Sequence, residues 1–115
     1  MGLVAETLWS LRIYATVDGR RPFAEWLDSL KDQRGRRAIK SRLDRVELGN
    51  FGDCRRLGGG LNELRVHFGP GYRVYFGQEG RRIILLLCGG DKTTQDKDIV
   101  KARGYWQDYW SRSDA

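Results

Sequence analysis

Apolar and polar residues alternate in two neighbouring stretches of the chain, residues 63–68 and 72–76. A period of two is typical of half-buried strands, and the Gly-Pro-Gly sequence between the stretches is a turn signal. We therefore predict a β-hairpin in which Arg65 and His67 share one face of the first strand. Arg73 lies on the polar side of the second strand. The hairpin brings Arg65 and Arg73 to one surface, and such a surface suits a phosphate.

Apolar residues recur at helical spacing in three other stretches. The first predicted helix spans residues 22–30, with a proline in its first turn, and its Trp26 is assigned to the core. The second spans residues 35–48 and ends near a glycine, as helices often do. Its apolar residues lie on one side, and its other sides are rich in arginine. The third begins near Thr94 and carries an aromatic stripe that we assign to docking against the rest of the protein.

Two further strands complete the predicted fold. Residues 12–17 read as a strand, and residues 83–87 form a continuous apolar run expected of a central strand buried on both faces. Residues 53–60, which end in three glycines, are interpreted as a flexible entry to the sheet. The order strand, two helices, three strands and helix indicates an α+β fold with an antiparallel or mixed sheet. We expect one domain over residues 1–115.

Positive charge is concentrated in the middle of the chain. The net charge is +6, and residues 34–82 hold 12 basic and 5 acidic side chains. A positive region of this kind favours a polyanionic partner such as RNA, although a solvated basic surface has the same composition. Candidate RNA contacts are Arg37 and Lys40 on the second helix and Arg55 and Arg56 before the hairpin.

The sequence also indicates which other classes of site to expect. Cys54 and Cys88 do not form a metal-binding spacing, so we expect neither a metal nor a cofactor. No secretory signal is recognisable, and the longest apolar run, residues 83–88, is too short to cross a bilayer. We therefore expect a cytoplasmic protein with no membrane partner.

Several short motifs, in this order and spacing, resemble one known family. They are Phe23-Ala24-Glu25-Trp26-Leu27, Leu61-x-Glu63-Leu64-Arg65, Gly69-Pro70-Gly71-Tyr72-Arg73-Val74-Tyr75-Phe76 and Gly89-Gly90-Asp91-Lys92-x-x-Gln95-x-x-Asp98-Ile99. Together they are similar to the addiction-module killer proteins of the RelE/ParE toxin superfamily, on the HigB-like or phage Gp49-like branch. The resemblance extends over about residues 10–110.

This resemblance implies a function. Proteins of the family are toxins of type II toxin-antitoxin systems, and a small antitoxin, often a helix-turn-helix protein of the HigA type, neutralises them. RelE-like members enter the ribosomal A site and cleave mRNA. We therefore expect a metal-independent endoribonuclease, an mRNA interferase, whose partners are the cognate antitoxin, the ribosome and mRNA.

The resemblance also suggests roles for individual residues. Cleavage by the neighbouring 2′-hydroxyl needs cations around the phosphate, together with a proton acceptor and a proton donor. Arg73 matches an arginine that contacts the scissile phosphate, Arg65 matches a basic position on the preceding strand, and Lys92 lies near a third one. His67 is a candidate general base or acid. Glu63 either competes for that role or forms an ion pair with Arg65 or Arg73.

Each of three residues near these cations has two possible roles. Tyr75 either stacks on an RNA base or packs inside the protein. Gln95 and Asp98 either contact RNA or form a helix cap. Better-known toxins have a tyrosine at the place where this chain has Asp98, so the mechanism does not transfer whole and the ribosome is expected to supply part of the catalysis.

Two other functions remain open at this level. A ParE-like protein with the same fold would poison DNA gyrase and would have no ribonuclease activity, since fold alone does not decide function. An inactive phage-derived remnant would bind an antitoxin and do nothing else.

Overall fold

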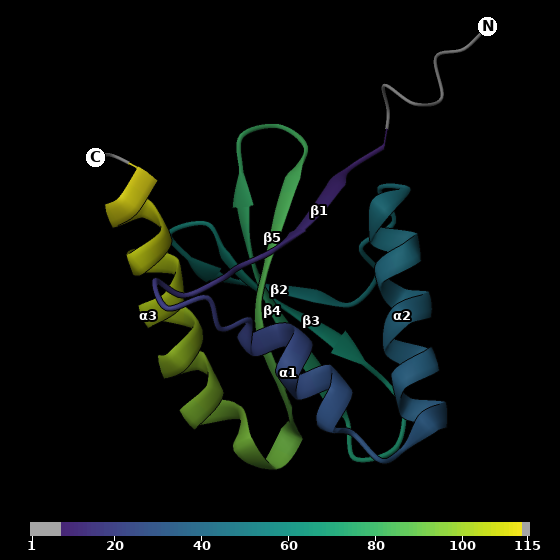
Figure 1. Ribbon diagram of the computed structural model, residues 1–115. Coiled ribbons are helices and arrows are strands. Elements are labelled where there is room, and N and C mark those ends of the chain that lie inside the picture. Colours follow the sequence, from purple (N-terminus) through teal and green to yellow (C-terminus); the bar gives the residue numbers. More distant parts are fainter. Residues whose placement is uncertain (1–7, 114–115) are drawn as a thin grey trace, which may run out of the picture.

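The computed structural model describes residues 8–113, which form a five-stranded sheet with helices on both faces (Figure 1). The strand order is β1-β5-β4-β3-β2; β1 runs parallel to β5 and all other neighbours are antiparallel. The predicted α+β fold with a mixed sheet is confirmed. In chain order the elements are β1 (Ser10–Ile13), α1 (Pro22–Ser29), α2 (Gln33–Glu47), β2 (Cys54–Gly58), β3 (Leu61–Val66), β4 (Tyr72–Glu79), β5 (Ile83–Asp91), the 3-10 turn η2 (Lys92–Thr94) and α3 (Gln95–Ser113).

The sheet separates two hydrophobic clusters. Apolar residues of α1 and α2 pack on one face, where Ile84 and Leu86 of β5 point. Residues of α3 pack on the other face, which receives Leu85 and Leu87. The prediction that residues 83–87 are buried on both faces is therefore confirmed, although the middle strand of the sheet is β4. Within residues 8–113 no helix has the length and apolar character needed to span a bilayer.

A β-bulge changes the alternation in β5. Tyr75 is paired with Cys88 and the next residue, Phe76, is paired with Leu86, so Leu87 is an extra residue between the two pairs. Leu87 and Cys88 consequently both belong to the cluster beneath α3. Beyond the bulge Gly89 faces α1 and Gly90 faces α3. A bulge of this type redirects side chains at a chosen point of a strand.

Local signals account for where the helices begin. Pro22 occupies the first turn of α1, as predicted. The Asp32 side chain caps α2 by accepting the Gly35 amide at 2.9 Å, and it also accepts the Tyr72 hydroxyl at 2.9 Å. The first bond satisfies an unpaired helical amide, and the second ties the start of α2 to β4.

Two strand predictions need correction. The first strand spans Ser10–Ile13 instead of residues 12–17. The supposed flexible entry at residues 53–60 contains β2, which pairs with β3 from Cys54 to Gly58. Exposed Arg55 and Arg56 interrupt the apolar pattern of β2. Charged residues are common on edge strands because they discourage pairing with other molecules, and β2 is the edge of this sheet.

Two glycines allow a test of the packing of α3 on the sheet. A Cβ atom at Gly77 in β4 would overlap the Trp106 ring, whereas one at Gly104 in α3 would meet nothing within 4 Å. We expect Gly77→Ala to lower the free energy of unfolding by about 1–3 kcal/mol through overpacking. Gly104→Ala should raise it by about 0.5–1 kcal/mol because alanine favours the helix. Urea denaturation of both variants measures this, and equal effects would contradict the packing described.

Candidate functional site

A buried carboxylate, Glu63, organises the face of the sheet that is turned toward α3. Its side chain is 0% exposed. Its Oε2 atom accepts Gln95 Nε2 at 2.7 Å and the Tyr75 hydroxyl at 3.1 Å. Its Oε1 atom accepts Arg65 Nε at 3.1 Å and lies 3.5 Å from Arg55 Nε. Four elements, β2, β3, β4 and α3, thus meet at one side chain.

The sheet register explains this convergence. Arg55, Glu63 and Tyr75 stand opposite one another on β2, β3 and β4, and Arg65 stands opposite Arg73. Residues two apart on a strand share a face, so all five side chains lie on the side covered by α3. The expectation that the hairpin brings Arg65 and Arg73 to one surface is confirmed.

The charge state of Glu63 follows from these contacts. Burial alone would raise the pKa of Glu63, but hydrogen bonds from Gln95, Arg65 and Tyr75 and the charge of Arg55 outweigh it and hold the pKa below its usual range. Burial and the Glu63 carboxylate together raise the pKa of Tyr75, so its hydroxyl remains a donor. Of the two interpretations of Glu63, the structure supports the ion pair, formed with Arg65 and Arg55.

Arg73 lies next to this network without joining it. Its side chain is only 8% exposed, and its Nε atom is buried with no hydrogen-bond partner among residues 8–113. Unpaired donors of this kind are rare, because leaving one buried costs about 1–3 kcal/mol. Arg73 is thus a buried cation with donor capacity left for an anion.

Lys92 lies near the same place. It follows β5 in η2 and its side chain is exposed. A Cβ atom at Gly71, in the hairpin turn, would lie 3.5 Å from Lys92 Cβ and 3.9 Å from Arg73 Nη1. The turn, the lysine and the arginine therefore meet at one end of the sheet. We call Arg65, Arg73 and Lys92, with the Glu63 network behind them, the cationic face.

His67 lies just beyond the end of β3, where it lines a pocket together with Arg42 and Arg45 of α2. Its Nε2 atom lies 2.6 Å from Asp53 Oδ2, and the imidazole is 72% exposed. The hydrogen bond to His67, and then the charge of Arg65, lower the pKa of Asp53. The backbone amide of Arg65 donates to the Asp53 carbonyl oxygen at 3.0 Å, so the pair lies beside Arg65. A histidine held by a carboxylate has a fixed ring orientation, which a proton-transfer role requires. The sequence analysis did not single out Asp53.

Tyr75 is a correction to the sequence analysis. Its side chain is fully buried and its hydroxyl donates to Glu63. The ring therefore offers no surface on which an RNA base could stack, and that interpretation is wrong. Gln95, at the start of α3, is partly exposed and also donates to Glu63, so it fixes α3 to the network instead of capping the helix.

The remaining basic residues fall into two groups. Arg55 belongs to the border of the cationic face, whereas Arg56, its neighbour on β2, stands opposite Asn62. Arg37 and Lys40 are exposed on α2, which covers the opposite face of the sheet. The structure therefore does not bring these two residues together with Arg73.

Arg42 has a role that the sequence did not reveal. It appeared to be one cation of an arginine-rich helix, but it is only 8% exposed. Its Nη2 atom donates to the carbonyl oxygens of Phe51, Asp53 and Arg65 at 3.0, 3.4 and 3.2 Å. Arg42 thus fixes the loop that carries Asp53 to the end of β3, and His67 is the residue that follows this strand.

Glu63 provides a test of the network. We expect Glu63→Gln to lower the free energy of unfolding at neutral pH by about 1.5–3 kcal/mol, because a hydrogen-bonded charge is lost. A lowered pKa gives stability that is present above the ordinary value of 4.5 and is lost as the pH falls through the folded-state value. The difference between the wild type and Glu63→Gln should therefore shrink below about pH 4.5. Urea titrations between pH 7 and pH 3 measure it.

Glu47→Gln is the matched control, since Glu47 is exposed at the end of α2. We expect its stability to follow the wild type at every pH. A constant difference between Glu63→Gln and the wild type over the whole range would contradict the role assigned to the carboxylate.

Comparison with known proteins identifies the family. A family model described as "Phage derived protein Gp49-like" matches residues 25–104, which include most of α1, the hairpin, the Glu63 network and about half of α3. A curated protein of Haemophilus influenzae (strain ATCC 51907 / DSM 11121 / KW20 / Rd), named "Uncharacterized protein", is 47% identical over 81 residues. The match covers 70% of this chain and 82% of that protein. The chain therefore belongs to the Gp49-like family of phage-derived proteins.

Proposed function

We propose that this protein is the toxin of a type II toxin-antitoxin system and acts as a ribosome-dependent mRNA endonuclease. Membership of the Gp49-like family supports the toxin assignment. The observation that supports the nuclease is Arg73, a mostly buried cation whose Nε atom has no partner among the described residues. Arg65 and Lys92 lie beside it, and the nearby carboxylate of Glu63 is already occupied by other donors. Three neighbouring cations of this kind would attract a phosphate.

The proposed reaction uses the 2′-hydroxyl of the RNA as the nucleophile. Its oxygen attacks the adjacent phosphorus, a proton leaves that hydroxyl, and the 5′-oxygen departs and takes up a proton. Negative charge accumulates on the phosphate oxygens in the transition state. Arg73, Arg65 and Lys92 would stabilise it, because cations fixed in advance need no reorganisation during the reaction. Arginine also holds two phosphate oxygens at once and stays charged.

His67 is the proposed proton carrier, with Asp53 as its positioning residue. The 2.6 Å contact between them fixes the ring, and the imidazole is exposed to a substrate. Asp98 stands where related toxins have a tyrosine, so the second proton-transfer group is not supplied in the usual way. The ribosome would compensate by holding the mRNA in a reactive geometry.

The partners follow from charge. Arg55 and Gln95, at the border of the cationic face, would contact mRNA, and Arg37, Lys40 and Arg56 would contact ribosomal RNA or mRNA at a distance from the reaction. An antitoxin with an acidic segment, of the helix-turn-helix HigA-like type, would neutralise the cationic face by occupying it. Both partners imply action in the cytoplasm.

Arg73 provides the central test. We expect Arg73→Ala to slow mRNA cleavage on purified ribosomes by about 10²–10³-fold, the usual loss when one transition-state donor is removed. Arg73→Lys should recover only part of the rate, because lysine lacks the planar fork. Primer extension of a defined mRNA, with and without ribosomes, gives the rates. Arg81→Ala is the control, since Arg81 lies in the turn at the other end of β4 and β5.

The same experiment separates the other functions. Unchanged cleavage by Arg73→Ala would contradict the assignment of the site. No cleavage by the wild type, together with DNA damage signalling after expression in cells, would indicate a gyrase poison. Normal growth under strong expression without an antitoxin would indicate an inactive remnant.

The cations of α2 provide a separate test. We expect the double variant Arg37→Ala/Lys40→Ala to bind ribosomes more weakly and with a salt dependence whose logarithmic slope is smaller by about 2, because two phosphate contacts are lost. Ser41→Ala, an exposed neutral site on the same helix, is the control. Ribosome cosedimentation over a range of KCl concentrations measures both. An unchanged slope would show that Arg37 and Lys40 do not contact RNA.

A further inference from the structure

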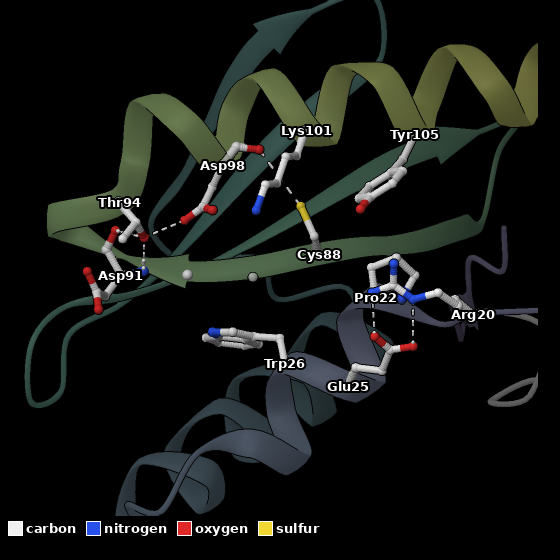
Figure 2. A pocket seen from close by; sticks show the side chains of 12 residues that line it. Arg20, Pro22, Glu25, Trp26, Cys88, Asp91, Thr94, Asp98, Lys101 and Tyr105 are labelled. Carbon is white, nitrogen blue, oxygen red and sulfur yellow. Dashed lines mark hydrogen bonds and ion pairs between the residues drawn. The ribbon is translucent and has the colours of Figure 1, made fainter.

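A cavity of about 450 Å³ opens between α1 and α3 at the outer side of β5 (Figure 2). It exists because β1 pairs only with residues 83–86 of β5, so Cys88 to Asp91 have no strand beside them on that side. The volume lies in the range of small-molecule sites. The cations assigned above to the phosphate, Arg65, Arg73 and Lys92, are not among the residues that line it.

Two glycines of β5 give the cavity its walls. A Cβ atom at Gly89 would overlap the Trp26 ring, and one at Gly90 would overlap the Asp98 carboxylate. Figure 2 shows Trp26 approaching the strand from α1, and Asp98 and Lys101 approaching it from α3. An aromatic ring and a carboxylate thus reach the strand from opposite sides because neither position carries a side chain.

Polar groups of several kinds line the cavity, among them the Arg20–Glu25 ion pair. Asp98 is only 7% exposed. Among the described residues, its carboxylate takes one side-chain hydrogen bond, from the Thr94 hydroxyl to Oδ2. Oδ1 has no such partner, and a carboxylate can accept about four hydrogen bonds. Lys101, one helical turn later, adds a donor, and Tyr105 adds a second aromatic ring. Burial raises the pKa of the Cys88 thiol to about 12, so that group stays neutral.

These features match the edge and the faces of a nucleobase. Single-stranded bases are recognised by stacking on aromatic rings and by hydrogen bonds along their Watson–Crick edge. Guanine presents two neighbouring donors, N1–H and N2–H, beside its O6 acceptor. A carboxylate next to an ammonium group is complementary to that order, whereas adenine, cytosine and uracil each offer the carboxylate one donor group on that edge.

The cavity is also within reach of the cationic face. Gly90 is paired with Arg73 in the sheet, so Asp98, which covers Gly90, stands above the strand next to Arg73. Neighbouring strands lie about 4.8 Å apart, a separation that one nucleotide spans between its phosphate and its base. We propose that this cavity binds a nucleobase of the RNA, guanine in preference, with Asp98 and Lys101 reading its edge and Trp26 and Tyr105 contacting its faces. The proposal deepens the proposed nuclease function and rests on it.

Nucleotide titrations monitored by NMR test the proposal without the ribosome. The probes are 5′-GMP, 5′-AMP, 5′-CMP and 5′-UMP, added to ¹⁵N-labelled protein. We expect GMP to shift the Trp26 indole N–H and the amides of Gly89 and Gly90, and to bind more tightly than the other three nucleotides. Asp98→Asn should weaken GMP binding about tenfold, as expected for one lost bidentate contact.

Two further variants keep the result interpretable. Asp96→Asn, at an exposed position in the same first turn of α3, should bind GMP like the wild type. Lys101→Ala, also at an exposed position, should weaken GMP binding without altering the fold. Equal binding of all four nucleotides, or GMP shifts that survive both Asp98→Asn and Lys101→Ala, would overturn the proposal.

Primer extension then separates the two proposals. If the wild type cleaves mRNA, Asp98→Asn should cut with a reduced preference for guanine, and an unchanged preference would overturn the cavity assignment alone. If the wild type binds GMP at Trp26 but cuts no mRNA, the nuclease function falls and the nucleobase site remains.

Discussion

The arrangement of this protein depends on a carboxylate that is completely removed from water. Transferring an ionised group into a protein interior costs several kcal/mol, so such a charge persists only where donors surround it. Glu63 receives its donors from β3, β4 and α3, with a further cation from β2. Contacts with the Glu63 carboxylate therefore stabilise the positions of these four elements, in addition to hydrophobic packing. The same bonds leave Arg73 outside the network, with its buried Nε atom unpaired among the described residues.

The sheet gives the cationic face a rigid support. Its two hydrophobic clusters lie on opposite sides, and α2 is joined to the loop before β2 by the buried guanidinium of Arg42. That loop carries Asp53, which holds His67. A buried side chain of α2 thus helps to position the exposed imidazole of His67. Sites placed on rigid elements hold their geometry more closely than sites on free loops.

Most of the fold could be predicted from short-range patterns in the sequence. The alternation around Arg65 and Arg73 and the helical spacing after Pro22 depend on neighbours a few residues apart, and both predictions are confirmed. Edge strand β2 was missed because its exposed arginines carry no apolar alternation.

The contacts within the site could not be predicted from the sequence, because they depend on the register of the whole sheet. Arg55, Glu63, Tyr75 and Gln95 are scattered over 41 sequence positions, and no local pattern says that they share one contact point. For the same reason, no local pattern indicated that Arg42 is buried or decided between the two interpretations of Tyr75. An arginine or a tyrosine looks alike in a sequence whether its polar atoms meet water or buried partners, and only tertiary contacts decide between the two.

The bulge in β5 has a consequence for how this family can vary. Because Leu87 is an extra residue, the two glycines after it face Trp26 and Asp98 in the required order. Removing one residue from the strand would turn each following side chain to the opposite face of the sheet. Gly89 would then face α3 instead of Trp26, and Gly90 would face α1 instead of Asp98. Homologous chains should therefore differ in length at the turns that flank β5, and substitution instead of insertion or deletion should be the tolerated form of change between Ile83 and Asp91.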